Sequence, residues 1–251
     1  HPGYDEAKIG VTTQMIGFDL DHCLITTRSG RTFPSDFVND WKLWDGQVAT
    51  KLKELYKAGA YLCIFSNQSM IAKPKFGEWT QVETKIRNIV KEIGVPMDFV
   101  CCYSQPSLFR KPNVGSWQMM QMYRCPNAVQ GESAYVGDAA GRRALGSWRA
   151  DFADTDYKLA LNLGVNFYTP ERFFLDDRSE LHNHLPVPSM YTKLSLSGGN
   201  KSLSSDEFAN VMRPSKVLAG GKEIVLMVAP AGCGKTTMAK MIQTRSRVED
   251  E

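Results

Sequence analysis

The sequence lacks the marks of a membrane or secreted protein. Its apolar runs all fall short of the length that crosses a bilayer, and no secretory signal opens the chain. No internal repeat and no low-complexity tract is present. These absences favour an ordinary soluble protein that binds no membrane. The chain begins with His1 rather than Met, so we expect it to be a fragment of a longer protein.

Cysteine is sparse, and its spacing argues against two kinds of site. No C-x-x-C pair and no zinc-ligand spacing occurs among Cys23, Cys63, Cys101, Cys102, Cys125 and Cys233. Several of these cysteines lie in apolar, strand-like runs, where a reduced thiol behaves as a small hydrophobe. We therefore expect a reducing nuclear or cytoplasmic compartment.

Neither sign of charge dominates the chain, whose net charge is only +3. Basic residues nevertheless outnumber acidic ones between residues 101 and 150. The basic residues there are Arg110, Lys111, Arg124, Arg142, Arg143 and Arg149, against Glu132 and Asp138. A local basic field is typical of a site for a polyanionic substrate. Scattered, solvated arginines are the alternative interpretation.

Strand-like and helix-like segments alternate along residues 1–185. The predicted strands are Met15–Leu20, Tyr61–Ser66, Phe99–Tyr103, Ser133–Val136 and Val165–Tyr168. Apolar residues at helical spacing predict helices at Gln47–Ala58, around Val82–Ile93 and around Leu159–Leu163, with Gly164 as the C-cap. This alternation predicts an α/β fold with a mostly parallel sheet flanked by helices.

Two aspartates, Asp19 and Asp21, follow the first predicted strand. Open α/β sheets bind their ligands at the carboxyl ends of their strands. Two carboxylates this close repel each other unless a cation neutralises them, and Mg²⁺ prefers oxygen ligands. We therefore expect a magnesium-dependent carboxylate nucleophile at this edge of the sheet.

Polar groups follow the other predicted strands in the same way. They are Ser66-Asn67-Gln68, Arg110-Lys111-Pro112 and Gly137-Asp138. A carboxylate can attack phosphorus, a second can transfer the proton, and a hydroxyl with an ammonium can hold the phosphate oxygens. Taken singly, each signal has a structural alternative: a helix cap for Ser66, a solvated loop for Lys111 and a turn for Gly-Asp. Their common placement favours phosphoryl-transfer chemistry.

These motifs resemble the haloacid dehalogenase superfamily of phosphatases. The carrying sequences are Phe18-Asp19-Leu20-Asp21, Ser66-Asn67-Gln68, Phe109-Arg110-Lys111-Pro112 and Tyr135-Val136-Gly137-Asp138. More narrowly, the chain resembles the polynucleotide kinase 3′-phosphatases, which remove 3′-phosphates from DNA ends. That resemblance rests on Leu24–Gly30, Gly137–Arg142 and Ala160–Gly164.

The resemblance implies a role for each matched residue. Asp19 would be the nucleophile and Asp21 the general acid/base, while Ser66 and Lys111 would hold the phosphate. The implied Mg²⁺ ligands are Asp19, Asp21 through its backbone carbonyl, and Asp138. The implied substrate-binding residues are Asn67, Gln68, Arg110 and Arg142, with the segment Thr26–Ser29 near the DNA strand.

The chain departs from the family pattern at two places. His22-Cys23 stands where the family usually has Gly-Thr, which predicts a lower rate or an altered pocket, and we expect His22 to lie at the surface or behind the site. Many relatives carry an acid four residues after the Gly-Asp aspartate, where this chain has Arg142. Asp154 or Asp156 is a candidate replacement, and exposed helix capping is the alternative for both.

The intervals between the motifs leave no room for a large cap domain. The segment Thr26–Trp44 can form only a small flap, so the phosphate pocket would stay open to a macromolecule. Its aromatic residues, Phe33, Phe37, Trp41 and Trp44, are expected to pack on the core, with stacking on bases as the alternative.

A second, incomplete domain follows. Residues 186–222 are rich in Ser, Gly and Pro and read as a linker. Residues 223–251 contain a strand and Ala229-Pro-Ala-Gly-Cys-Gly-Lys-Thr-Thr237, which resembles a P-loop with Gly232, Gly234, Lys235 and Thr236 at the phosphates. A glycine-rich turn is the alternative. Too little chain follows to complete a kinase, so we expect kinase activity and ATP binding only in the full-length protein.

Three functions remain open at this stage: a Mg²⁺-dependent DNA 3′-phosphatase, a phosphatase for small metabolites, and a DNA-end binding module with weakened catalysis. The open site and the basic segment favour the first. We expect a nuclear protein, with the mitochondrion as the alternative, that acts on DNA with 3′-phosphate ends in strand-break repair. A missing N-terminal module would bind repair scaffold proteins.

Overall fold

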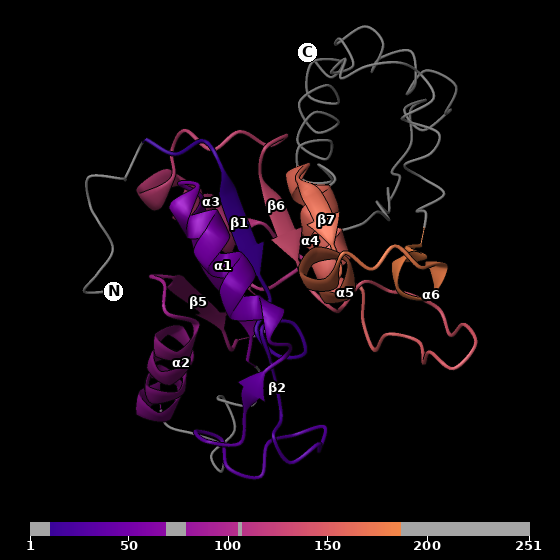
Figure 1. Cartoon of the computed structure of the whole chain (residues 1–251). Coiled ribbons are helices and arrows are strands. Elements are labelled where there is room, and N and C mark those ends of the chain that lie inside the picture. Colours follow the sequence, from indigo (N-terminus) through magenta and orange to yellow (C-terminus); the bar gives the residue numbers. More distant parts are fainter. Residues whose placement is uncertain (1–10, 69–78, 105–106, 187–251) are drawn as a thin grey trace, which may run out of the picture. The chain divides into compact units, whose positions relative to one another are not determined.

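The computed structural model describes residues 11–68, 79–104 and 107–186. Its main sheet has five parallel strands in the order β5-β4-β1-β6-β7 (Figure 1). The strands are β1 (Met15–Phe18), β4 (Tyr61–Asn67), β5 (Asp98–Cys102), β6 (Ala134–Val136) and β7 (Asn166–Tyr168). Each overlaps a predicted strand segment, with β4 and β5 each reaching one residue beyond it. The predicted α/β fold with a parallel sheet is confirmed.

Helices connect these strands and cover both faces of the sheet. They are α1 (Gln47–Lys57), α2 (Trp79–Ile93), α3 (Gly115–Arg124), α4 (Thr155–Leu163), α5 (Pro170–Leu175) and α6 (Glu180–Asn183). Helix α4 ends as predicted at Gly164, whose φ of 70° is left-handed. The sequence pattern gave no helix at α3, because Ser116 and Trp117 alone of its residues are buried and no apolar stripe marks it.

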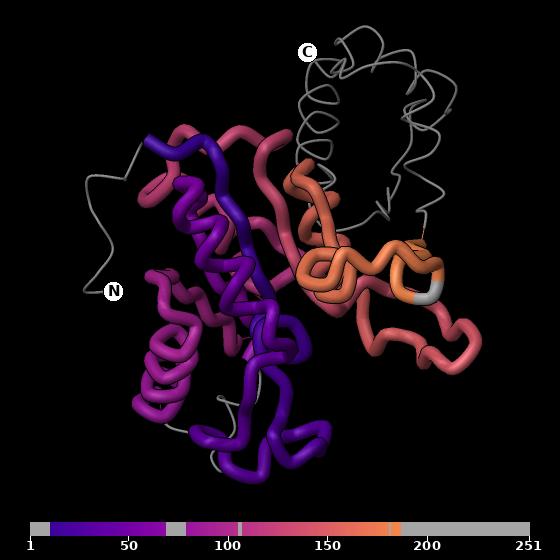
Figure 2. The backbone as a smooth tube through the Cα atoms, in the orientation of Figure 1, coloured from indigo at the N-terminus to yellow at the C-terminus, as the bar shows by residue number. Residues whose placement is uncertain are grey.

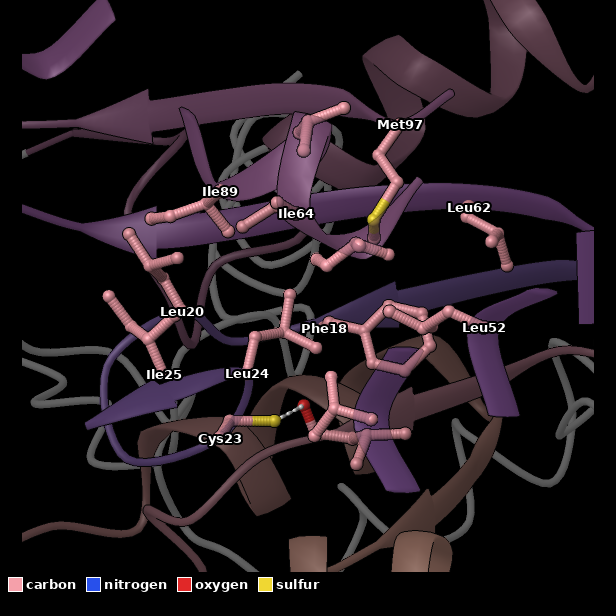
Figure 3. Close-up of a cluster of buried hydrophobic side chains, with 14 of the residues drawn as sticks. Phe18, Leu20, Cys23, Leu24, Ile25, Leu52, Leu62, Ile64, Ile89 and Met97 are labelled. Atoms are coloured by element: carbon pink, nitrogen blue, oxygen red, sulfur yellow. Dashed lines mark hydrogen bonds between the residues drawn. The ribbon is translucent and has the colours of Figure 1, made fainter. Parts of the chain in front are cut away.

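The strand residues alternate between two hydrophobic cores, as the pleat of a β-strand requires. On one face Ile16, Phe18 and Ile64 pack against α1, α2 and α5 (Figure 3). On the other, Met15, Cys63, Phe65 and Tyr135 join Trp117 of α3 and Leu159 of α4. Full burial of such a side chain stabilises the fold by about 1.5–3 kcal/mol. The two cores hold the strands, and therefore their carboxyl ends, in a fixed register.

The flap (residues 26–44) lies between β1 and α1 and extends beyond the carboxyl end of the sheet (Figure 2). Its ends pair as a short antiparallel ladder of β2 (Ile25–Thr26) and β3 (Lys42–Leu43). Asp40 fastens its middle, accepting hydrogen bonds from the backbone N–H of Ser29 and of Ser35, both at 2.7 Å. The expected small flap is therefore present, and no cap domain lies in the described part of the chain.

The flap's aromatic residues mostly face inward. Phe37, Trp41 and Trp44 pack against the core, as expected, whereas Phe33 is exposed. Within the described ranges, no helix combines the length and the apolar character that crossing a membrane requires. The predicted linker and P-loop segment lie outside the described residues, so the three-part organisation stays a prediction.

Candidate active site

Lys111 joins several of the predicted strand-end groups at the carboxyl edge of the sheet. Its ammonium contacts Asp19 Oδ1, which directly follows β1. It also lies 2.8 Å from Asp156 Oδ1 and 3.0 Å from the hydroxyl of Tyr135. Lys111 is only 5% exposed. Burial opposes its charge, but the carboxylates of Asp156 and Asp19 outweigh that effect and hold the pKa of Lys111 well above its ordinary value.

Asn67 fixes the backbone of Lys111. Its side-chain Nδ2 donates to the Lys111 carbonyl, and its Oδ1 accepts from the Lys111 N–H, both at 3.1 Å. The amide is thereby engaged at both ends. These two hydrogen bonds place Lys111, and the substrate contact of Asn67 expected from the sequence stays a prediction.

Gln68 links the predicted acid/base to the predicted phosphate-binding hydroxyl. Its Nε2 donates to Asp21 Oδ2 at 2.7 Å and to Ser66 Oγ at 2.8 Å. On its other side Asp21 faces Lys85 of α2, whose ammonium lies 3.7 Å from Oδ1. Asp21 thus stands in the same site as Asp19 but makes no contact with Lys111.

The carboxylates of Asp19, Asp138 and Asp156 form a cluster, with one oxygen of each lying within 4.8 Å of the others. Burial, followed by mutual repulsion, raises the pKa of Asp19 to about 7, against the attraction of Lys111. The same causes hold the pKa of Asp138 well above its usual value. Three gathered oxygen donors fit a hard divalent cation, which would relieve this repulsion.

The cluster contains two of the predicted ligands, Asp19 and Asp138. Asp21 was expected to bind through its backbone carbonyl, and that ligand stays a prediction. Asp156 takes the place that the sequence left open between two residues. It is 1% exposed. Its carboxylate lies 2.8 Å from Lys111 Nζ and accepts a hydrogen bond from the N–H of Ala139 at 3.0 Å. Asp154, by contrast, pairs with the exposed Lys158.

Comparison with known proteins identifies this arrangement. Residues 14–174 match the family described as polynucleotide kinase 3 phosphatase, a range that contains every residue of the site. The chain belongs to this family.

The chain is also similar to curated proteins of several kinds. A bifunctional polynucleotide phosphatase/kinase of Schizosaccharomyces pombe is 35% identical, over 93% of this chain and 52% of its own length. An uncharacterized 20.8 kDa protein of Autographa californica nuclear polyhedrosis virus is 39% identical, over 68% and 88%. A polynucleotide 3′-phosphatase of Arabidopsis thaliana is 32% identical, over 64% and 24%. The chain spans about half the length of the fission-yeast relative.

His22-Cys23, the predicted departure from the family pattern, follows Asp21 directly. His22 has a φ of 62°, the left-handed region in which glycine is favoured, and its side chain is exposed as expected. Cys23 is fully buried, and its thiol donates to the Val136 carbonyl at 3.4 Å (Figure 3). Burial raises the pKa of this thiol well above its ordinary value, so Cys23 acts as a core residue and not as a nucleophile.

Arg142 requires a correction. It was expected to contact DNA, but it is 2% exposed. Its guanidinium pairs with Asp151 at 2.9 Å and Glu171 at 3.2 Å, and lies 4.7 Å from the ring of Trp148. It also donates to the carbonyl of Asp138 at 3.3 Å. Each of its three nitrogens has a partner inside the protein, so the buried guanidinium braces the loop that carries Asp138 rather than facing a substrate.

The basic segment is therefore less available than its composition indicated. Lys111 and Arg142 are buried, and Arg124 lies 3.3 Å from Asp98. Arg143 and Arg149 are exposed, and Arg110 is half-buried beside Lys111. Contact of Arg110 and of Thr26–Ser29 with DNA stays a prediction.

Helical spacing carried signals that the sequence reading missed. Asp156 lies three, four and seven residues before Leu159, Ala160 and Leu163, the buried face of α4. Lys85 lies between Val82 and Ile89 on the buried stripe of α2. A buried charge on an apolar stripe needs a polar partner: Asp156 pairs with Lys111, and Lys85 pairs with Asp21. The P-loop residues Gly232, Gly234, Lys235 and Thr236 lie outside the described residues.

Proposed function

We propose that this chain hydrolyses the 3′-phosphate of DNA ends with the help of Mg²⁺, through an aspartyl-phosphate intermediate. One observation carries the proposal: Asp19 lies in contact with Lys111 and beside the carboxylates of Asp138 and Asp156, while Asp21 stands apart within the same site. The site therefore holds one carboxylate for attack and another for proton transfer.

In the first step an oxygen of Asp19 attacks phosphorus, and the bond between phosphorus and the 3′-oxygen breaks. The electron pair of that bond stays on the 3′-oxygen, which takes the proton of the Asp21 carboxyl group. In the second step Asp21 removes a proton from water, and the resulting oxygen nucleophile attacks phosphorus. Inorganic phosphate leaves, and Asp19 is restored.

The other residues hold the transferred group. Lys111 supplies a fixed positive charge beside Asp19, and Ser66 Oγ offers a hydroxyl at the end of β4. Asp19, Asp138 and Asp156 would hold the Mg²⁺, which supplies charge neutralisation between the phosphate and the attacking carboxylate. Because Asp156 and Asp19 both contact the Lys111 ammonium, that charge stays in place throughout the cycle.

The choice of DNA as substrate has separate support. The family and two of the curated relatives are named for action on polynucleotides, and the described part of the chain carries a small flap but no cap domain. An open site admits the end of a polymer. A role in strand-break repair follows from that substrate, because polymerase and ligase need a 3′-hydroxyl. The fission-yeast relative is named as both a phosphatase and a kinase. We therefore also propose that the longer protein has 5′-hydroxyl kinase activity.

The test compares phosphate release from a 3′-phosphorylated nicked duplex with release from a panel of sugar phosphates, each with and without Mg²⁺. We expect release from the duplex alone to be fast, Mg²⁺-dependent and abolished by Asp19→Ala. Equal or faster turnover of a sugar phosphate would make the chain a metabolite phosphatase. Absence of release from every substrate, with retained DNA binding, would make it a DNA-end binding module.

A further inference from the structure

Lys85 is a buried cation whose presence the fold alone does not explain. It lies on the apolar stripe of α2 and is 4% exposed. Lysine is almost never fully buried without a partner, because removing its charge from water is unfavourable. Its ammonium lies 3.7 Å from Asp21 Oδ1 and 5.0 Å from the centre of the Phe37 ring in the flap.

This ion pair contributes little to stability. The side chain of Asp21 is 47% exposed, so water screens its attraction to the ammonium of Lys85. An apolar side chain at position 85 would fill the same stripe with no charge to bury. The charge of Lys85 therefore matters for the position of the Asp21 carboxylate rather than for the packing of the core.

Asp21 is held from two sides. Gln68 donates to Oδ2, and Lys85 faces Oδ1, so the two oxygens of the carboxylate have different neighbours on different elements. The exposed side of the carboxylate is left to the substrate. A general acid has to lie within hydrogen-bond reach of the leaving oxygen, and displacement by about 1 Å can cost a hundredfold in rate.

We propose that Lys85 is a positioning residue that fixes the carboxyl group of Asp21 for proton transfer to the leaving 3′-oxygen. Lys85 itself neither gives up nor takes a proton, and it touches no reacting atom. Its contact with Phe37 ties this position to the flap, so the flap and the acid are placed by the same side chain. The inference rests on the proposed function, since it assigns Asp21 the proton transfer described there.

The leaving group provides the test. A 3′-oxygen leaves poorly without a proton, whereas p-nitrophenolate leaves readily without one, so only the first needs a placed acid. The experiment measures kcat/KM with Mg²⁺ for a 3′-phosphorylated oligonucleotide and for p-nitrophenyl phosphate, because kcat/KM reports the first phosphoryl transfer. The variants are Lys85→Met, which keeps the apolar stem, and Lys91→Met, an exposed control on the same helix.

We expect Lys85→Met to lower kcat/KM for the oligonucleotide about tenfold or more and to change that for the aryl phosphate less than about threefold. Lys91→Met should change neither. Lys85→Arg, which retains a cation, should recover part of the loss. Phe37→Leu should give a smaller loss of the same kind, since it removes the ring beneath the ammonium but leaves the charge.

Two results would overturn the inference while the proposed function stands. Equal losses on both substrates would mean that Lys85 merely supports the structure, and unchanged kcat/KM on both would mean that it has no role. If the unmodified chain released no phosphate from the oligonucleotide, the proposed function would fail and this inference with it. The aryl phosphate serves as an internal check that each variant is folded.

Discussion

The carboxylate of Asp156 packs directly on Gly137, so closely that a Cβ added to this glycine would lie 2.4 Å from Asp156 Oδ2. Gly137 directly follows β6 and precedes Asp138. Because glycine has no side chain, Asp138 and Asp156 can both approach Asp19. This close approach is a requirement of the site rather than of the sheet.

A methyl group at position 137 should push Asp156 away from the other two carboxylates of the cluster. Gly137→Ala displaces Asp156, and we expect at least a tenfold loss of phosphatase activity and a cost of about 1–3 kcal/mol in stability. Gly131→Ala is the control, because nothing lies within 4 Å of a Cβ at that glycine. Phosphate release and urea unfolding of both variants check the expectation, and a fully active Gly137→Ala protein would contradict it.

Substitution of Asp156 should change the Mg²⁺ dependence of activity, whereas substitution of Asp154 should not. Asp156→Asn removes one charge from the cluster, and we expect half-saturation of phosphatase activity at a Mg²⁺ concentration about ten or more times higher. Asp154→Asn, which changes an acid paired with exposed Lys158, should leave the Mg²⁺ dependence unchanged. Titration of the activity with Mg²⁺ gives the answer. Identical curves for the two variants would remove Asp156 from the ligand set.

Arg142→Met should act on stability and not on DNA affinity. The substitution leaves Asp151 and Glu171 without their buried partner, and we expect unfolding to become easier by about 3–5 kcal/mol. Arg143→Met, at an exposed neighbouring position, should change stability by less than about 0.5 kcal/mol. A raised KM for DNA in Arg142→Met at unchanged stability would restore the contact expected from the sequence.

Cys23→Thr should be well tolerated. A threonine hydroxyl can donate to the Val136 carbonyl as the thiol does, so we expect stability within about 1 kcal/mol of the unmodified chain. Cys23→Val, of similar volume, loses this hydrogen bond and should cost about 0.5–1.5 kcal/mol, because the same carbonyl still accepts from the Asp19 N–H at 2.8 Å. Urea unfolding distinguishes the two, and a Thr variant less stable than the Val variant would refute the assignment.

The raised pKa of Asp19 should make the metal-free protein less stable as pH rises. The folded protein keeps a proton on Asp19 up to about pH 7, whereas the unfolded chain releases it near its ordinary value of 3.8. Between these values the folded state binds more protons, so the free energy of unfolding falls as pH rises and this contribution is lost above about 7. Asp138 acts in the same direction.

The measurement is urea unfolding in a chelator across that window, for the unmodified chain and for Asp19→Asn. The variant has no titratable group at this position, so its pH dependence should be shallower. Mg²⁺ should stabilise the unmodified chain most at the upper end, where it meets ionised carboxylates. Parallel pH profiles for the two proteins would be evidence against the raised pKa.

The sequence by itself determined the sheet and the edge at which the site lies. Parallel strands expose their carboxyl ends together, so residues that directly follow buried apolar runs, such as Asp19, Ser66 and Asp138, were bound to meet. The alternation of strands and helices was readable because burial imposes a period on each element. Helix α3, with few buried residues, left no such period.

The tertiary structure alone decided which charges are available. Arg142 and Arg143 are neighbours in the chain, yet one is buried among carboxylates and the other is exposed. Asp154 and Asp156 lie two residues apart, yet only Asp156 reaches Lys111. The partner of a charge lies on another element, at a distance set by how helices pack on the sheet. The spacing of residues along the chain determines which face of a helix or strand each side chain occupies. Packing of the elements determines which side chains that face contacts.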